Sequence, residues 1–166
     1  MALARLGTLL GIDPGLAATG YGVIEDGDRV VSCGTIRTRP GPTGPRLAAI
    51  ASALEAIIAA HPPSEASMEE LFAGRNTSSA LAVAQARGVL LLLLERAQIP
   101  VYEYKPAQVK AILTGYGDAG KPQMARMLAA QLHVDEAVDD HAVDALAIAL
   151  CHLRSRRQRH QQERTR

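Results

Sequence analysis

The residues best suited to chemistry in this sequence are carboxylates that stand where secondary-structure elements are predicted to end. Asp13 closes an apolar, strand-like run, and Pro14-Gly15 turns the chain directly after it. Glu69 follows the short strand-like segment EASM in the same way. If a helical crossover makes these two strands neighbours, both carboxylates meet at one edge of the sheet.

The last predicted helix supplies two further side chains. His141 and Asp144 are three residues apart, so they share one face near the start of that helix, and Ile148 continues the face. Converging carboxylates with no Lys or Arg nearby in sequence repel each other and raise their own pKa values, unless divalent cations neutralise them. The pattern therefore predicts a metal site.

Each of these residues also has a purely structural explanation. Asp is favoured as the first residue of a turn, so Asp13 could have that role alone. Glu69 and Glu70 could form a solvated loop, and the acidic residues between Asp139 and Asp144 could cap the last helix and complement its dipole. The arrangement of the residues, more than any one of them, carries the prediction.

The stretch GYGDAGKP, residues 115–122, resembles the phosphate-binding loop of nucleotide hydrolases but does not fit it. Pro122 stands where that loop needs a hydroxyl for Mg²⁺. A phosphate loop must also follow a strand, whereas the preceding PAQVKAILT has a helical pattern. We therefore expect a turn between two helices, with Pro122 in the first turn of the second helix.

The element pattern predicts one α/β domain. Strands are expected at 8–13, 20–25, 30–38, the start of 65–72 and 100–105, and helices at 47–60, 77–98, 106–114, 121–132 and 139–153. Glycine-bearing turns separate the first three strands, which predicts that they run antiparallel. Asp139 or Asp140 is expected to cap the last helix, whose other face is expected to pack inward through Ala142, Val143, Leu146, Leu150 and Leu153.

Composition limits the classes of partner. Six arginines lie in the tail that starts at Arg154, so residues 1–153 keep 18 − 6 = 12 basic against 17 − 1 = 16 acidic side chains, and nucleic-acid binding must rest on local basic positions. Residues 154–166 are expected to be a frayed, flexible extension of a single domain formed by 1–153. Cys33 and Cys151 are expected to be reduced, buried thiols. No signal peptide or membrane span is expected, which predicts a cytoplasmic protein.

Several segments together carry a resemblance to a known family. LGIDPGLAATGYGVIE, MEELFAGRN, QARGV, EYKPAQVK and HAVDALAIA occur in this order, and the chain resembles the RuvC family of Holliday-junction resolvases up to about residue 153. The resemblance implies a ribonuclease H-like α/β fold with a five-stranded mixed sheet in the order 3-2-1-4-5. It also implies a homodimer that makes paired symmetric nicks in four-way junction DNA during recombination and repair, leaving 5′-phosphate and 3′-hydroxyl ends.

The same resemblance implies the site. It places the catalytic, metal-binding positions at Asp13, Glu69 and Asp144, with a fourth acidic position occupied here by His141. Two cations, Mg²⁺ or Mn²⁺, would lie about 3.5 to 4 Å apart. Because imidazole suits Mn²⁺ better than Mg²⁺, we expect Mn²⁺ to support activity at least as well. Asp140 is interpreted as a cap, although a contribution to the site is conceivable.

DNA-binding positions follow from the resemblance too. Phe72 corresponds to an aromatic that the family uses against unpaired bases, although a buried Phe is an equal alternative. Arg75 and Asn76 share its loop. Lys110 and Lys121 match lysines implicated in cleavage or backbone binding, and solvated lysines are the alternative.

Further partners and rival functions remain open from sequence. The resemblance implies the RuvA and RuvB branch-migration proteins as partners. The rivals are an actin-like or sugar-kinase ATPase, which needs a second domain, a related resolvase family that fits only the first motif, and a junction-binding module with weak or no catalysis.

Overall fold

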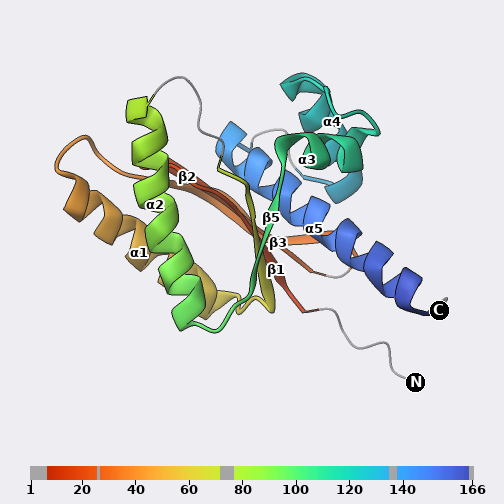
Figure 1. Cartoon of the computed structure of the whole chain (residues 1–166), viewed down its shortest axis with the longest axis horizontal. Helices are drawn as coiled ribbons and strands as arrows, with labels where there is room; N and C mark the ends of the chain where they lie inside the picture. Colours follow the sequence, from red (N-terminus) through yellow and green to blue (C-terminus); the bar gives the residue numbers. More distant parts are fainter. Residues whose placement is uncertain (1–6, 26, 72–76, 135–137, 165–166) are drawn as a thin grey trace.

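The computed structural model describes residues 7–25, 27–71, 77–134 and 138–164 (Figure 1). Its strands are β1 (Leu9–Asp13), β2 (Ala18–Glu25), β3 (Arg29–Arg37), β4 (Glu65–Glu69) and β5 (Val101–Tyr104). Its helices are α1 (Thr43–Ala60), α2 (Thr77–Arg96), α3 (Pro106–Thr114), α4 (Lys121–Leu132) and α5 (Asp140–Arg164).

The strands form one mixed sheet in the order β3-β2-β1-β4-β5, which confirms the predicted order. The β1–β2 and β2–β3 pairs are antiparallel, as the glycine-bearing turns predicted, and β4 runs parallel to both β1 and β5. Ile12 pairs with Met68, and the next residue of each strand is Asp13 and Glu69. Parallel pairing therefore brings these two carboxylates to the same edge of the sheet.

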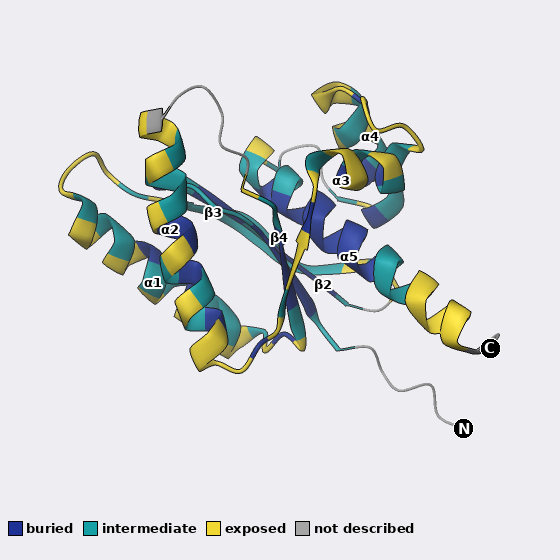
Figure 2. Cartoon of the chain, in the orientation of Figure 1, coloured by how far each residue is buried: buried dark blue, intermediate teal, exposed yellow. Residues whose placement is uncertain are grey.

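Helices cover both faces of the sheet (Figures 1 and 2). On one face, α1 and α2 pack Ile50, Leu54 and Leu90 against β1 residues such as Leu10. On the other face, α5 lies against the sheet, with α3 and α4 packed on it. Because neighbouring strand residues point to opposite faces, the apolar residues of β1 contribute to both cores.

Glycines allow α5 to lie directly on the strands. A Cβ atom added to Gly11 would stand 2.1 Å from the carbonyl oxygen of Ala145, and one added to Gly20 would stand 1.9 Å from that of His141. No side chain fits at either position, so the backbone of α5 approaches the sheet closely enough to bring its first turn beside the end of β1.

The last helix differs from the sequence-based expectation in two ways. It does not stop near residue 153, and the expected frayed extension is helical up to Arg164. Arg157 forms an ion pair with Asp28 at 3.0 Å, and Arg156 forms one with Glu65 at 3.3 Å. These acidic partners lie far away in sequence, which is why local charge density alone predicted a solvated tail.

Burial of α5 also extends further around the helix than predicted. Ile148, which was expected to continue the face of His141 and Asp144, is only 2% exposed, because α3 and the sheet both contact this stretch. α1 begins at Thr43 instead of residue 47, since Pro42 and Pro45 are compatible with a helix start. Cys33 and Cys151 are free, as expected, although Cys33 is only half-buried.

Two helices are long and apolar enough to cross a membrane by length and composition alone, Thr43–Ala60 and Ser78–Arg96. The expectation that the chain has no membrane span rested on the shortness of the apolar run at 88–94 alone. Core helices of soluble proteins pass the same test. In this fold both helices contribute buried residues to the core under the sheet, namely Ile50 and Leu54 from α1 and Leu90 and Leu94 from α2.

Candidate active site

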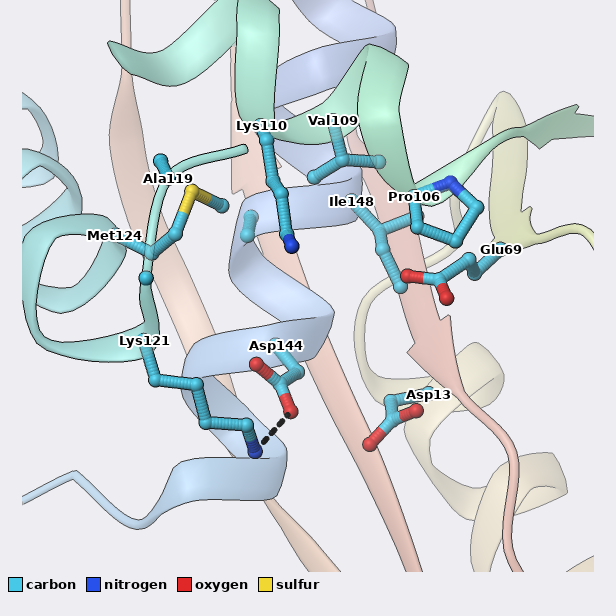
Figure 3. A pocket seen from close by; sticks show the side chains of 12 residues that line it. Asp13, Glu69, Pro106, Val109, Lys110, Ala119, Lys121, Met124, Asp144 and Ile148 are labelled. Atoms are coloured by element: carbon cyan, nitrogen blue, oxygen red, sulfur yellow. Dashed lines mark ion pairs between the residues drawn. The ribbon is translucent and has the colours of Figure 1, made fainter. Parts of the chain in front are cut away.

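Three carboxylates from three different elements line one cavity of about 360 Å³ (Figure 3). Asp13 comes from the end of β1, Glu69 from the end of β4 and Asp144 from the first turns of α5. Val109, Met124 and Ile148 are among the apolar side chains that line the same cavity. The structure thus brings together the three acidic residues that the sequence singled out.

His141 lies beside this cavity and contacts its deepest carboxylate. Its Nδ1 is 3.1 Å from Oδ2 of Asp13, and its side chain is 42% exposed. The two residues are 128 positions apart in sequence. An Nδ1–H donor orients Asp13, and it leaves the other ring nitrogen of His141 available as a ligand.

The first turn of α5 is fixed by Asp139, which confirms one of the two predicted caps. Its Oδ1 accepts a hydrogen bond from the Ala142 backbone N–H at 3.1 Å. Thr35 and Arg37 of β3 also donate to this carboxylate. The Thr35 hydrogen bond, more than the others, lowers the pKa of Asp139. β3 therefore holds in place the turn that carries His141, and Asp140 is an exposed first residue of the helix.

The electrostatics of the cavity agree with the expectation of mutual repulsion. Burial raises the pKa of Asp13, the charge of Asp144 raises it further, and the hydrogen bond from His141 opposes both effects. Burial likewise raises the pKa of Glu69, with smaller contributions from Asp13 and Asp144. The site therefore concentrates negative charge that it only partly compensates itself.

The compensating positive charge comes from lysines that are distant in sequence. Nζ of Lys121 lies 3.6 Å from Oδ2 of Asp144 (Figure 3). Lys110 on α3 also lines the cavity and lowers the pKa of Glu69. The stretch GYGDAGKP is the predicted turn between two helices, with Pro122 in the first turn of α4, and it reaches the acidic site through Lys121.

Arg87 is a buried arginine whose contact with the site the sequence analysis did not predict. It extends from α2 and donates from Nη1 to the backbone carbonyl of Glu69 at 2.9 Å. Its Nη2 forms an ion pair with Glu103 of β5, and its side chain is only 9% exposed. Arg87 thereby clamps the end of β4 where Glu69 leaves the sheet. Its position inside a long, apolar helix was the available signal, since an Arg is rarely buried without partners.

The donor types of the cavity fit a divalent cation. Carboxylate oxygens are the ligands that Mg²⁺ and Mn²⁺ prefer, and imidazole extends the set towards Mn²⁺. As the side chains lie, no three His, Cys, Asp or Glu residues of the described segments are close enough together to hold one ion. The unneutralised charge on Asp13 and Glu69 indicates what a cation would contribute there.

Three of the predicted DNA-binding residues, Phe72, Arg75 and Asn76, lie outside the described residues. The chain that carries them connects β4, which ends at Glu69, to α2, which begins at Thr77. They stay predictions. Lys110 and Lys121 are the predicted DNA-binding residues that the structure brings to the acidic cavity.

The mixed sheet in the order β3-β2-β1-β4-β5, with helices on both faces, defines a ribonuclease H-like fold, and the acidic side chains at the ends of β1 and β4 and on the final helix form its candidate active site. The family model described as "Crossover junction endodeoxyribonuclease RuvC" matches residues 9–152. The chain belongs to the RuvC family, and it is accordingly a nuclease of the hydrolase class.

Individual relatives agree with this assignment. The RuvC of Pelotomaculum thermopropionicum is 46% identical over 149 residues, covering 87% of this chain and 91% of that protein. The RuvC of Chloroflexus aggregans is 50% identical over 148 residues, covering 86% of this chain and 90% of that protein.

Solved structures show the same fold. The structure of T. thermophilus RuvC in complex with a Holliday junction substrate has a TM-score of 0.85 and 34% identity, covering 92% of this chain and 96% of that chain. The yeast mitochondrial Holliday junction resolvase Ydc2 has a TM-score of 0.63 at 14% identity, covering 92% of this chain and 82% of that chain, so it supports the fold alone.

Proposed function

We propose that this nuclease resolves Holliday junctions by paired, metal-dependent nicks, using Asp13, Glu69, Asp144 and His141. The observation that carries the proposal is the convergence of Asp13, Glu69 and Asp144 on one cavity in a member of the RuvC family. A relative with 34% identity and a matching fold has been solved with a Holliday junction substrate, which supports the same substrate here. The products are expected to carry 5′-phosphate and 3′-hydroxyl ends.

RuvC nucleases in general depend on metal ions. In this chain Asp13, Glu69, Asp144 and His141 would hold the metal, and two ions per site are our expectation. A divalent ion bound there would supply an activated water and would neutralise charge at the scissile phosphate. The protein residues define where the phosphate lies, because they come from the ends of two strands and from a helix that packs directly on the sheet.

The remaining side chains of the cavity have electrostatic roles in this proposal. Lys121 is paired with Asp144 and offers an ammonium group to a DNA phosphate. Lys110 lines the same cavity, and its charge acts on Glu69 without an ion pair. His141 donates to Asp13, so that the carboxylate keeps one orientation. The imidazole also favours Mn²⁺ over Mg²⁺ as the activating ion.

Paired cuts require two active sites, so the proposal includes a homodimer. A two-fold axis in the protein would match the two-fold symmetry of a four-way junction. Phe72, Arg75 and Asn76 would contact the DNA near the junction centre. The RuvA and RuvB branch-migration proteins are proposed as partners in the cytoplasm, where this soluble, DNA-acting protein would work.

The test is cleavage of a labelled mobile four-way junction, beside a linear duplex of the same sequence, in Mg²⁺ and in Mn²⁺. Asp13→Asn and Glu69→Gln should abolish cleavage. Glu70→Gln is the matched control for the second variant, because Glu70 is the adjacent carboxylate and is not among the residues that line the cavity within the described segments. Asp144→Asn is compared with Asp140→Asn, because Asp140 is not among the described residues that line the cavity. Cleavage that is kept in Asp140→Asn would mean that Asp140 does not contribute to the active site.

Symmetric nicks on the junction alone, lost in the cavity variants and kept in the controls, would support the proposal. Tight junction binding without cleavage in either metal would contradict it, and the chain would then be a binding module. Equal loss of cleavage in Glu70→Gln and Glu69→Gln would contradict the assignment of the site residues. It would not contradict the proposal that the substrate is a Holliday junction.

A further inference from the structure

A second cavity, of about 370 Å³, lies where β3 ends and α1 begins. Three arginines line it, Arg37, Arg39 and Arg46, and the prolines and glycine of the connecting segment frame it. No Asp or Glu belongs to its lining among the described residues. In a chain whose first 153 residues carry more acidic than basic side chains, this is a local concentration of positive charge in a concave place.

This cavity, the arginine cavity, is built against the active-site edge of the sheet. The backbone N–H of Thr38 donates to Ala17 at 3.0 Å, and the Thr38 hydroxyl donates to the Leu16 carbonyl at 2.6 Å. Both acceptors belong to the turn that directly follows Asp13. Arg37 reaches Asp139, the cap of the turn that carries His141, at 3.0 Å. The arginine cavity is thus linked by direct contacts to both the β1 end and the α5 start.

The arginine cavity and the lysines lie on different sides of the acidic site. Lys110 and Lys121 come from α3 and α4, which pack on the α5 side of the sheet, whereas the arginine cavity includes the start of α1 on the opposite side (Figure 1). A nucleic-acid strand whose scissile phosphate lies at the carboxylates extends away from them in two directions. Positive charge therefore stands on both flanks of the acidic site.

Two of the three guanidinium groups, those of Arg39 and Arg46, are available to an anion, because Arg37 is paired with Asp139. Arg46 uses its Nε to donate to the Thr38 hydroxyl at 2.9 Å, which orients the side chain and leaves both terminal nitrogens for a ligand. Arg39 is exposed and forms no ion pair within the described part of the chain. A guanidinium is planar and binds phosphate through two parallel hydrogen bonds, so an arginine set of this kind suits phosphodiester oxygens. The first turn of α1 contains no acidic residue, so it does not offset this charge.

From these contacts we infer that the arginine cavity binds backbone phosphates of the DNA arm that leaves the active site on the β3–α1 side, through Arg39 and Arg46. The inference rests on the proposed function, because it concerns the path of the same substrate. Phosphate contacts of this type fix the position of the DNA without reading its sequence. The arginine cavity would thus hold the arm in register with the carboxylates.

The experiment measures equilibrium binding of the full-length protein to a labelled four-way junction in EDTA, across a series of salt concentrations. Arg39→Gln and the double variant Arg39→Gln/Arg46→Gln are compared with Arg96→Gln. Arg96 is an exposed arginine in the last turn of α2, and its replacement removes the same charge. Arg39→Lys keeps the charge but loses the planar fork. Thermal melting of every variant verifies that it is folded.

Each lost phosphate contact should reduce the steepness of the logarithmic salt dependence by about 0.9, and so by about 1.8 in the double variant. Affinity at low salt should fall about tenfold for each lost arginine contact. Arg39→Lys should keep the salt dependence of the wild type and lose only part of its affinity. Arg96→Gln should match the wild type in both measurements.

Two failures can be told apart. If the wild type binds and cleaves the junction, and the Arg39 and Arg46 variants keep its salt dependence just as Arg96→Gln does, the arginine cavity does not contact DNA and the inference is wrong. If the wild type itself shows no preference for the junction over linear duplex, the proposed function fails, and the inference fails with it.

Discussion

The contact between α5 and β2 allows a sharp test of how the site is assembled. Gly20 is paired with Asp13 across the β1–β2 ladder, and a Cβ atom added to it would lie 1.9 Å from the carbonyl oxygen of His141. Real Cβ contacts are essentially never shorter than 3.0 Å, so in Gly20→Ala the two backbones must separate by at least 3.0 − 1.9 = 1.1 Å. The obstacle is backbone, which cannot rotate away as a side chain would.

The expected consequence is a large loss of cleavage with the fold retained. Separating His141 from Asp13 by about 1 Å breaks their 3.1 Å contact and misplaces a proposed ligand. A misplacement of that size can reduce a catalysed rate by about 100-fold. Overpacking of this kind typically costs about 1 to 3 kcal/mol of folding free energy, which a folded domain can tolerate.

The assay is the single-turnover rate constant for cleaving a labelled four-way junction at saturating enzyme, with junction binding in EDTA measured on the same samples. Gly44→Ala is the control, since no atom lies within 4 Å of a Cβ at that position. It should cleave at the wild-type rate and be stabilised by up to about 1 kcal/mol, because Ala favours a helix over Gly. A Gly20→Ala protein that cleaves like the wild type would refute the reasoning that α5 must touch the sheet backbone to form the site.

Three further predictions concern charge, metal and support of the site. Burial raises the pKa of Asp13 above its ordinary value of 3.8. The native state therefore binds the Asp13 carboxyl proton more tightly than the unfolded state does. As a result, the free energy of unfolding falls as the pH rises through the raised pKa. Asp13→Asn should therefore melt at a higher temperature than the wild type at neutral pH in EDTA, with the gain disappearing in acid; a lower melting temperature at neutral pH would contradict this sign. His141→Asp should shift the ratio of cleavage rates from Mn²⁺ towards Mg²⁺, because a carboxylate is the harder ligand, and an unchanged ratio would argue against His141 as a metal ligand. Arg87→Lys should lower both stability, by about 1 to 3 kcal/mol in chemical denaturation, and the cleavage rate, because a Lys lacks the planar fork whose two nitrogens separately reach the Glu69 carbonyl and Glu103. Wild-type values for both would mean that the clamp on β4 is dispensable.

The sequence predicted most elements to within a few residues, because turn chemistry and apolar periodicity are local properties. Asp13 was recognisable as a strand end from the Pro14-Gly15 that follows it. The errors came where local and distant signals disagree. The arginines of residues 154–164 suggest a solvated tail when taken alone. In the structure they belong to α5, where Arg156 forms an ion pair with Glu65 and Arg157 forms one with Asp28.

The candidate site was predictable as a set of residue types, although not as a geometry. Repulsion among Asp13, Glu69 and Asp144 was expected from their convergence. Burial is the larger cause of the raised pKa values of Asp13 and Glu69, and the neighbouring carboxylates add to it. The contact of Lys121 with Asp144 was not predicted, since Lys121 is distant from Asp144 in the sequence. The pairing of helices around the turn at 115–120 brings that lysine to the site.

By itself, the sequence determined which residues could bind metal and DNA, and which segments could be strands or helices, because side-chain chemistry and backbone preference belong to each residue and its near neighbours. Only the tertiary structure decided which of them meet. Parallel pairing of β1 with β4 places Asp13 beside Glu69, and the absence of a Cβ at Gly11 and Gly20 lets α5 bring His141 and Asp144 to the same edge. Distances between residues more than a hundred positions apart are set by strand register and helix packing, and no local pattern contains that information.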